Sequence, residues 1–448
     1  MSISGTIRNV ALLSALLLDA GMVFAQATAP AGAESSAPLT ITLPDALARA
    51  KINEPQYRAA LTDYGVARQN TVQSRAALLP NVNYNAGFLY TQGNGTSTGR
   101  FIAANGVHEY LSQGVARETL SFETLAGYRK ARALEALAKA RSVIATRGLA
   151  VAVTQAYYAT VVTQRKYAAA QRAAGEATHF YEISEKLERG GEVAHSDAIK
   201  AQLQQQQEQR ALQDAQLEME RARLELAILI FPDFNQNFTT VDDLETPLPL
   251  PSFPEIEALA AKSNPQLAAA LAELRAANQE VAAAWNGFLP SLSLDYAYGI
   301  DASRFAVNGT DLATGRMVRN LGYAATATLE LPIWSWGAGR SRVKSAHLQR
   351  DQARVELSFA QRKMVADLKA FYSESQTSRA QLNSLRQSSE LAAESLRLTT
   401  LRYQAGEATA LEVVDAQNTL TATQGALADG EARYRVALAG LQTLTGTF

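Results

Sequence analysis

Two carboxylates near the C-terminus are the residues whose spacing best suits chemistry. Glu412 and Asp415 lie three positions apart in a segment with helical character, so they share one face of that helix. A charge pair of this kind is usually a solvated helix surface, and the spacing alone assigns the two carboxylates no further role.

Residues for catalysis or metal binding show no such arrangement. The sequence lacks an H-E-x-x-H motif, a phosphate-binding glycine loop and cysteine, and its four histidines are scattered without ligand spacing. They are His108, His179, His195 and His347. We therefore expect no enzyme, metal or cofactor. The enzymatic alternative, a hydrolase of envelope polymers, requires a carboxylate pair in a cleft.

Short segments alternate between polar and apolar residues. In 81–90, NVNYNAGFLY, Asn81, Asn83 and Asn85 alternate with Val82, Tyr84 and other apolar residues. Successive side chains of a strand point to opposite faces, so this strand has one wet face and one apolar face. A soluble sandwich edge and a membrane barrel both show this pattern.

The chain contains an internal duplication. Pro55 and Leu79-Pro80 recur 210 positions later as Pro265 and Leu289-Pro290. The Gly-Glu pair that begins at Gly191 recurs 215 positions later at Gly406. The two-faced strand at 81–90 has its counterpart in SLSLDYAYGID, residues 291–301. Repeats of this length point to two halves with the same order of elements.

The N-terminal composition and the two repeats together predict the domain organisation. Residues 1–27 have the charge, apolar run and small-residue end of a signal peptide, and 28–43 form a linker. The first repeat, 44–231, has a helix over 44–79, strands at 81–92 and 109–123, a long helix, a turn at 190–191 and a helix. An equatorial linker, 232–253, leads to the second repeat, 254–448, with strands at 291–301 and 320–333 and a turn at 406.

Two helices are predicted to be very long. No proline interrupts Gly127–Arg189 or Gly339–Gln404, and each segment would extend roughly 95 Å as a helix. Leu382, Leu396 and Tyr403 belong to a seam of 3-4 heptad spacing, which is typical of coiled coils. The fold class is therefore α+β, with four strands and long coiled-coil helices.

Bulk properties limit the functions further. The formal net charge of -1 over 448 residues argues against nucleic-acid binding. The sequence contains no run of 18 or more apolar residues without a charge, so it predicts no transmembrane helix. If the four strands span a membrane, several chains must share one barrel, because about eight strands already fill their own interior. Three chains would supply twelve strands.

At this point the chain resembles the TolC family of outer-membrane efflux proteins. The resemblance covers nearly all of the mature chain. It rests on the duplication, on FLPSLSLDYAYG, on LPIWSWGAGRSRV and on LRYQAGEATALEVVDAQNTL. It implies a homotrimer with a twelve-stranded β-barrel in the outer membrane and an α-helical barrel in the periplasm. It also implies a passive exit duct of an efflux or type I secretion system, which docks with a periplasmic adaptor and an inner-membrane pump.

The resemblance also implies site residues. The tip turns, Gly190-Gly191 and Gly406-Glu407, would form the periplasmic entrance and the adaptor-docking surface. Asp197 and Tyr403 match the family's closing network, but the position of its arginine is Ala408 here, so the network is incomplete. Glu412 and Asp415 match the acidic rings, and Lys200, the counterpart of Asp415, can pair with an acid and weaken that field. Asp197 lies near the start of its helix and can equally stabilise that helix through its favourable interaction with the helix dipole.

Two assignments stay open on the sequence alone. Trp334, Trp336 and Tyr323 suit an aromatic belt at a membrane interface or a packed core. The functional alternative to the duct is a periplasmic coiled-coil adaptor, which explains the long helices but not four duplicated strands. The cargo is not indicated, because the expected duct wall is polar and generic.

Overall fold

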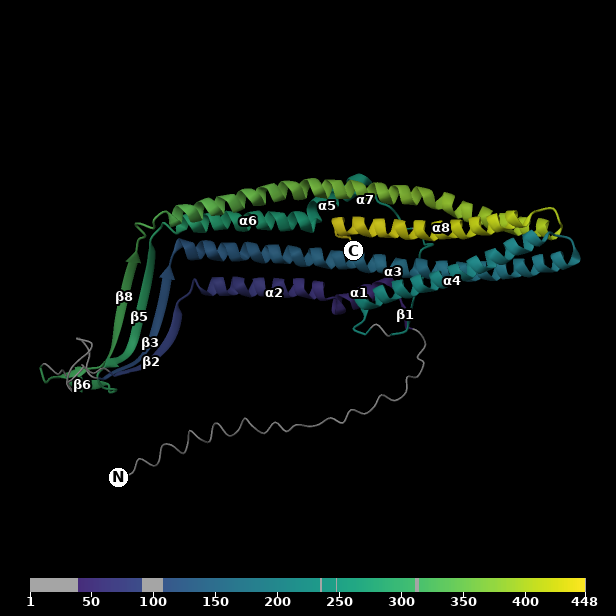
Figure 1. Ribbon diagram of the computed structural model, residues 1–448. Coiled ribbons are helices and arrows are strands. Elements are labelled where there is room, and N and C mark those ends of the chain that lie inside the picture. Colours follow the sequence, from purple (N-terminus) through teal and green to yellow (C-terminus); the bar gives the residue numbers. More distant parts are fainter. Residues whose placement is uncertain (1–38, 91–107, 234–235, 247, 311–313, 448) are drawn as a thin grey trace, which may run out of the picture. The chain divides into compact units, whose positions relative to one another are not determined.

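The computed structural model describes residues 39–90, 108–233, 236–246, 248–310 and 314–447. The chain divides into two units, Met1–Leu39 and Thr40–Phe448, and the description below concerns the second (Figure 1). The predicted signal peptide, 1–27, lies outside the described residues. Within the predicted linker, 28–43, a short strand covers Leu39–Ile41, and the first helix starts at Leu43, one residue before the predicted start of the first repeat.

Eight helices and eight strands make up the described residues. The helices are α1 (Leu43–Asn53), α2 (Pro55–Ala76), α3 (Phe122–Gly190), α4 (His195–Ile230), α5 (Phe253–Ser263), α6 (Pro265–Asn286), α7 (Ala338–Gln404) and α8 (Ala410–Thr445). The strands are β1 (Leu39–Ile41), β2 (Asn81–Tyr90), β3 (His108–Leu120), β4 (Phe238–Thr240), β5 (Ser291–Ala302), β6 (Asn308–Thr310), β7 (Met317–Arg319) and β8 (Leu321–Glu330).

The predicted single helix over 44–79 is in fact two helices. Glu54 has extended backbone angles between α1 and α2, and its carboxylate accepts a hydrogen bond from the amide of Tyr57. Proline disfavours the helical conformation of the residue before it, and Pro55 follows directly. Asn264 before Pro265 repeats this break between α5 and α6. The duplicated proline therefore marks a helix boundary in both halves.

One antiparallel sheet contains the four predicted strands, in the order β2-β3-β5-β8. Its register continues the apolar face of β2 across the sheet: Val82 pairs with Ala116, Ala116 with Tyr296, and Tyr296 with Ala325. The opposite face carries the polar residues Asn81, Asn83, Asn85, Gln113, Ser293, Asp295, Thr326 and Thr328. The sheet thus has one mainly apolar and one mainly polar face.

The register also explains β3, whose sequence alternates poorly. Arg117 lies on the polar face directly opposite Asp295, and the two side chains form an ion pair. Glu118 is the one acidic residue of β3 that lies on the apolar face of the sheet. The predicted strand 109–123 ends too late, because Ser121 accepts a hydrogen bond from the Thr124 amide at 3.0 Å and begins α3. Similarly, the strand predicted at 320–333 ends at Glu330.

Along the length of the molecule the elements pack side by side at three successive levels, and at each level they form one row. At the first level the row is the sheet β2-β3-β5-β8. Next to it α2 packs on α3, α3 on α6, and α6 on α7 (Figure 1). Beyond that, α4 packs on α3, α3 on α8, and α8 on α7. Each row ends in an element that has a neighbour on one side only.

Four buried apolar clusters hold the helices together, and two of them matter most for the site. The larger surrounds Tyr157, Val161, Leu226 and Ile230, where α1, α3, α4 and the 238–246 segment meet. The other lies near the helix turns and contains Phe180, Leu396, Tyr403 and Val413. No helix among the described residues is both long and apolar enough to cross a membrane.

Candidate functional site

The two helix turns at the tip have the same backbone structure. Gly191 and Gly406 have φ angles of 76° and 78°, a left-handed conformation that glycine adopts without strain. The amides of Gly191 and Glu192 donate to carbonyls of the last turn of α3, and those of Gly406 and Glu407 do the same for α7. This is the Schellman arrangement, and the duplicated Gly-Glu pairs therefore encode one reversal twice.

Tyr403 lies in the core beside the tip rather than on its surface. Its side chain is 2% exposed, its hydroxyl lies 2.9 Å from that of Ser184, and its ring packs edge-on against Phe180. Burial raises the pKa of Tyr403, and the charge of Asp197 adds to this shift. Tyr403 thus joins α7 to α3 within one chain, and Asp197 lies near it as the sequence suggests.

Glu412 is engaged by its own helix turn. Its carboxylate accepts hydrogen bonds from the amide and the hydroxyl of Thr409, each at 3.1 Å, and Arg402 lies 3.5 Å away. These hydrogen bonds lower the pKa of Glu412. The arrangement is a capping box at the start of α8. Glu412 therefore has a structural role that its acidic-ring assignment did not anticipate.

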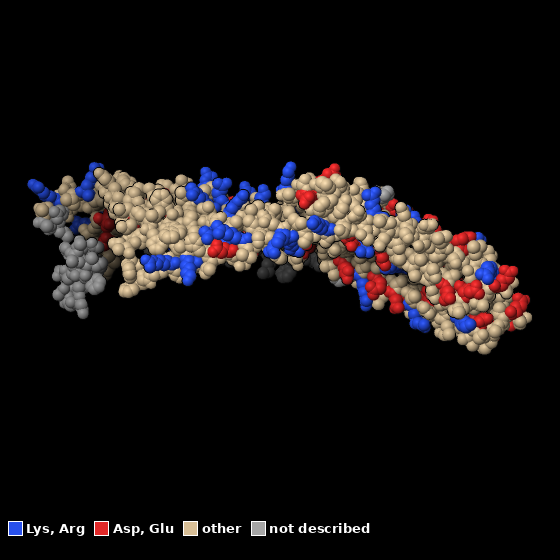
Figure 2. All heavy atoms as spheres, turned by 90° about the horizontal axis from the view of Figure 1, so that it is seen from above, with Lys and Arg blue, Asp and Glu red and all other residues tan. Residues whose placement is uncertain are grey.

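Asp415 is exposed on α8, and its carboxylate has no hydrogen-bond or ion-pair partner among the described residues. Lys200, its counterpart in the first half, lies 3.3 Å from Asp197. The lysine thus pairs within α4, as the sequence allowed. Figure 2 shows Asp and Glu atoms concentrated over the tip end of the helices. Asp415 is the predicted gate carboxylate that remains available to an ion.

A buried polar contact behind the tip was not predicted. The amide of Gln204 on α4 donates to Glu208 at 2.8 Å and to Asn418 on α8 at 3.1 Å. Gln204 and Glu208 are both buried. Burial raises the pKa of Glu208, and no cation offsets it. The glutamine-rich segment QLQQQQEQR, 202–210, is the signal in the sequence that could have indicated this contact.

Replacing Glu208 with glutamine should stabilise the protein at neutral pH. The folded-state pKa of Glu208 is raised, so the folded state gains stability as the pH falls through that pKa and loses it as the pH rises. Glu208→Gln keeps the hydrogen bond without the buried charge. We expect its Tm in detergent to rise by about 2 °C at pH 7.5 and to match wild type at pH 4.

Asp214→Asn, an exposed change on the same helix, is the matched control and should leave Tm unchanged at both pH values. A lower Tm for Glu208→Gln at pH 7.5 would show that the charge of Glu208 stabilises the contact instead.

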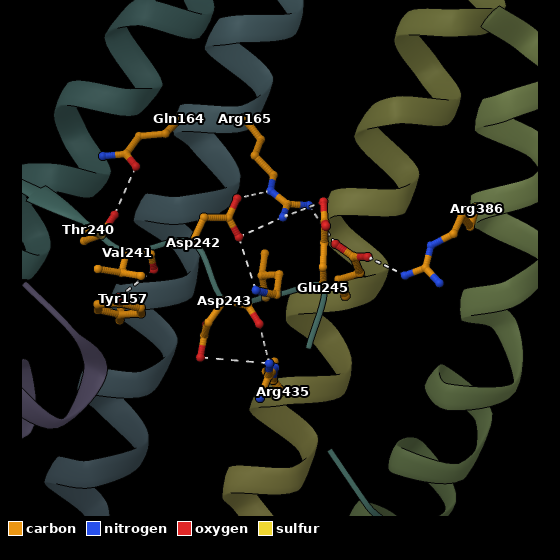
Figure 3. Close-up of polar contacts among 12 residues, drawn as sticks. Tyr157, Gln164, Arg165, Thr240, Val241, Asp242, Asp243, Glu245, Arg386 and Arg435 are labelled. Carbon is orange, nitrogen blue, oxygen red and sulfur yellow. Dashed lines mark hydrogen bonds and ion pairs between the residues drawn. The ribbon is translucent and has the colours of Figure 1, made fainter. Parts of the chain in front are cut away.

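An ion cluster at the equator connects three helices to the linker between the repeats (Figure 3). Arg165 of α3 forms ion pairs with Asp242 of the linker and with Glu431 of α8, the latter at 2.7 Å. Arg386 of α7 contacts the same Glu431 at 3.3 Å. The side chain of Glu431 is only 2% exposed. One buried carboxylate is thus shared by arginines from two helices.

Hydrogen bonds to the backbone fix the linker beside this cluster. The hydroxyl of Tyr157 donates to the carbonyl of Val241 at 2.7 Å, and burial raises its pKa to about 12. The guanidinium of Arg435 donates to the carbonyl of Asp243 (Figure 3). It also donates to the carbonyl of Thr246 at 2.8 Å. The segment 238–246, predicted as an irregular linker, is therefore held firmly, and its strand β4 pairs with β1.

Aromatic side chains lie toward both ends of the apolar sheet face. At the end away from the helices, the ring of Tyr110 lies 4.9 Å from that of Phe88 and 6.3 Å from that of Phe305. At the end nearest α7, Trp334 and Trp336 contact each other and are highly exposed. They do not belong to a core. Tyr323 instead stacks on Tyr296 within the sheet, apart from the tryptophans.

Comparison with known proteins identifies this architecture. A family model described as outer membrane efflux protein matches residues 258–447. Alkaline protease secretion protein AprF of Pseudomonas aeruginosa is 25% identical over 411 residues, covering 88% of this chain and 82% of that protein. Outer membrane protein TolC of Escherichia coli is 24% identical over 424 residues, covering 89% of this chain and 81% of TolC.

Solved structures show the same fold. The Campylobacter jejuni CmeC outer membrane channel superimposes with a TM-score of 0.76 at 19% identity, covering 90% of this chain and 85% of CmeC. The open state of the Neisseria gonorrhoeae MtrE outer membrane channel gives 0.74 at 21% identity, covering 90% and 88%.

Fold, sheet and duplicated tip turns thus define an outer-membrane channel subunit. Residues 258–447 match the outer membrane efflux protein family, and the chain as a whole is similar to proteins of the TolC family. The family resemblance, the α+β fold class and the outer-membrane localisation predicted from the sequence are confirmed.

Proposed function

We propose that three copies of this chain close into one duct, which carries substrates of an inner-membrane pump across the periplasm and the outer membrane. The observation that carries this proposal is the open row at each level of the fold. Each row has two different unpaired edges: β2 and β8, α2 and α7, and α4 and α7. Contact between two different edges of identical chains generates a ring when the rotation between neighbouring copies closes.

The sheet supports three copies rather than two. An open strand edge cannot face lipid, because its backbone groups would lack hydrogen-bond partners. Pairing β8 of one chain with β2 of the next removes every edge. About eight strands fill their own interior, whereas twelve leave room for water. The polar face with Asn81, Asn83 and Asn85 then lines the lumen, and the apolar face contacts lipid.

The helices at the row edges carry apolar side chains that have no partner within one chain. On α7, Val355 and Phe359 are 61% and 59% exposed. On α4, Leu203, Leu217 and Leu224 follow heptad spacing and are exposed. Stripes of this kind are the seams of coiled coils, and a neighbouring copy covers them in the ring.

The partners follow from the passive nature of the duct. Its family comprises channel proteins, and a passive channel needs a pump to drive transport. The tip turns at Gly190, Gly191, Gly406 and Glu407 are the proposed docking surface for a periplasmic adaptor that links the duct to that pump. An adaptor role for the chain itself leaves the two-faced sheet unexplained.

At the entrance, Asp415 is the proposed selectivity residue. Threefold repetition places three such carboxylates around the opening, where they attract cations. Glu412 adds charge while capping α8. Asp197 and Tyr403 are proposed to take part in the closed arrangement through α4 and α7, with Ala408 at the position of the family's arginine.

Planar-bilayer recordings test the duct. We expect wild-type protein to conduct ions with a preference for cations. Asp415→Asn should reduce the cation-to-anion permeability ratio at least about twofold, because it removes three charges from the constriction. Asp63→Asn, an exposed carboxylate on α2, is the control and should behave as wild type. Particles without conductance would refute the duct, whereas unchanged selectivity of Asp415→Asn would refute only the acidic ring.

A further inference from the structure

The connection between β5 and β8 folds into a small hairpin. Strands β6 and β7 pair antiparallel, with Asn308 opposite Arg319. The side-chain amide of Asn320 donates to the carbonyl of Ala306 at 3.0 Å, and a side chain at Gly309 would collide with that amide. The base of the hairpin is therefore a specific structure rather than a loose loop.

Three arginines of this hairpin project into solvent. Arg304, Arg316 and Arg319 are exposed, and none forms an ion pair with any residue that the structure describes. Figure 2 shows Lys and Arg atoms at this end of the sheet. The contrast with Arg117, which pairs with Asp295 inside the sheet, indicates that the hairpin leaves its positive charge for a partner.

Apolar side chains stand directly beside these arginines. Phe305 is 64% exposed and Met317 is 83% exposed. The ring of Phe305 approaches Tyr110, which lies on the apolar face of the sheet. The hairpin thus continues the lipid-facing surface beyond the last aromatic residues of the strands, and it adds positive charge at that level.

The topology places the hairpin at the outer surface of the membrane. All four long strands join helices at their other ends, at residues 77–81, 120–122, 286–291 and 330–338. On the proposed function, on which this step rests, the helices lie in the periplasm. The hairpin is therefore at the level of the outer-leaflet headgroups.

We propose that Arg304, Arg316 and Arg319 bind the phosphate groups of a phosphorylated glycolipid of the outer leaflet, while Phe305 and Met317 contact its acyl chains. Guanidinium groups form paired hydrogen bonds with phosphate oxygens. Positive charge next to exposed apolar side chains is the pattern of a surface that recognises anionic lipid. Three equivalent sites then surround the barrel and anchor it in the leaflet.

The test measures binding of fluorescent bisphosphorylated lipid A to the purified trimer in detergent. We expect Arg316→Gln/Arg319→Gln to bind about thirtyfold more weakly than wild type, since each arginine near an anionic lipid contributes a factor of about five. Dephosphorylated lipid A should bind the wild type as weakly as bisphosphorylated lipid A binds this variant. The control is Arg68→Gln/Arg275→Gln, two exposed arginines of α2 and α6 without ion pairs among the described residues, and it should bind as wild type.

Equal binding of both lipids, or wild-type affinity of Arg316→Gln/Arg319→Gln, would overturn the proposal. Displacement of lipid A by inorganic phosphate, but not by chloride of equal ionic strength, would show a site for free phosphate instead. Each variant is first checked for trimer mass and conductance. Failure of the lipid site in trimers that conduct is thus distinguishable from failure of the proposed duct.

Discussion

Aspartate at Val355 and Phe359 of α7 is expected to abolish the trimer. Both side chains are largely exposed in the single chain, so Val355→Asp/Phe359→Asp should leave the fold of that chain intact. In the proposed ring they face the neighbouring copy, and a carboxylate buried there without a partner costs several kcal/mol. Light scattering corrected for bound detergent should give the mass of three chains for wild type and of one chain for the variant.

The control places the same two charges elsewhere on α7. Gln349→Asp/Gln361→Asp changes two exposed polar positions outside the apolar stripe, and the particle should keep the mass of three chains. A trimeric Val355→Asp/Phe359→Asp protein would show that this stripe faces water or lipid. The arrangement of the rows would then need a different contact between copies.

The strand faces were predictable because period-two alternation is local. Tyr84 and Asn83 reveal their faces from neighbours within the same ten residues. In β3 the adjacent Arg117 and Glu118 obscured the period, and only pairing with Asp295, 178 positions away, assigns the arginine to the polar face. Local pattern thus gave the sheet, and long-range register resolved its one ambiguous strand.

The tip shows the same division. The paired glycines predicted both turns, because a left-handed residue after a helix is a local requirement. The partner of Tyr403 is Ser184, 219 positions earlier, and no spacing rule could supply it. The residues predicted for the gate lie near the helix turns, and whether each is buried, capped or free depends on tertiary contacts.

The equatorial ion cluster was not predicted, because its partners also lie far apart in the sequence. Arg165 and Glu431 are 266 positions apart, and each looks like an ordinary surface charge within its own helix. The acids Asp242, Asp243 and Glu245 lie in the segment that the sequence predicted only as a linker. Burial converts these charges into a structural contact, and burial follows from the packing of α3, α7 and α8 rather than from local composition.

Removing the shared carboxylate of Glu431 should be strongly destabilising. Glu431→Gln leaves Arg165 and Arg386 facing a neutral amide, and breaking a buried ion pair by removing one partner typically costs about 3–5 kcal/mol. We expect the variant to unfold in detergent at markedly lower denaturant concentration than wild type. Because the site is buried, raising the salt concentration should leave most of that difference in place.

Glu374→Gln is the matched control. Glu374 of α7 pairs with Arg433 of α8, just as Arg386 of α7 pairs with Glu431 of α8, but the side chain of Glu374 is 38% exposed. Exposed ion pairs contribute about 0–1 kcal/mol, so this variant should unfold close to wild type, and any loss should vanish in high salt. Equal effects of the two substitutions would mean that Glu431 acts as one more surface charge. A large loss at Glu431 alone would identify the equatorial cluster as the contact that fixes α3, α7 and α8 to the linker.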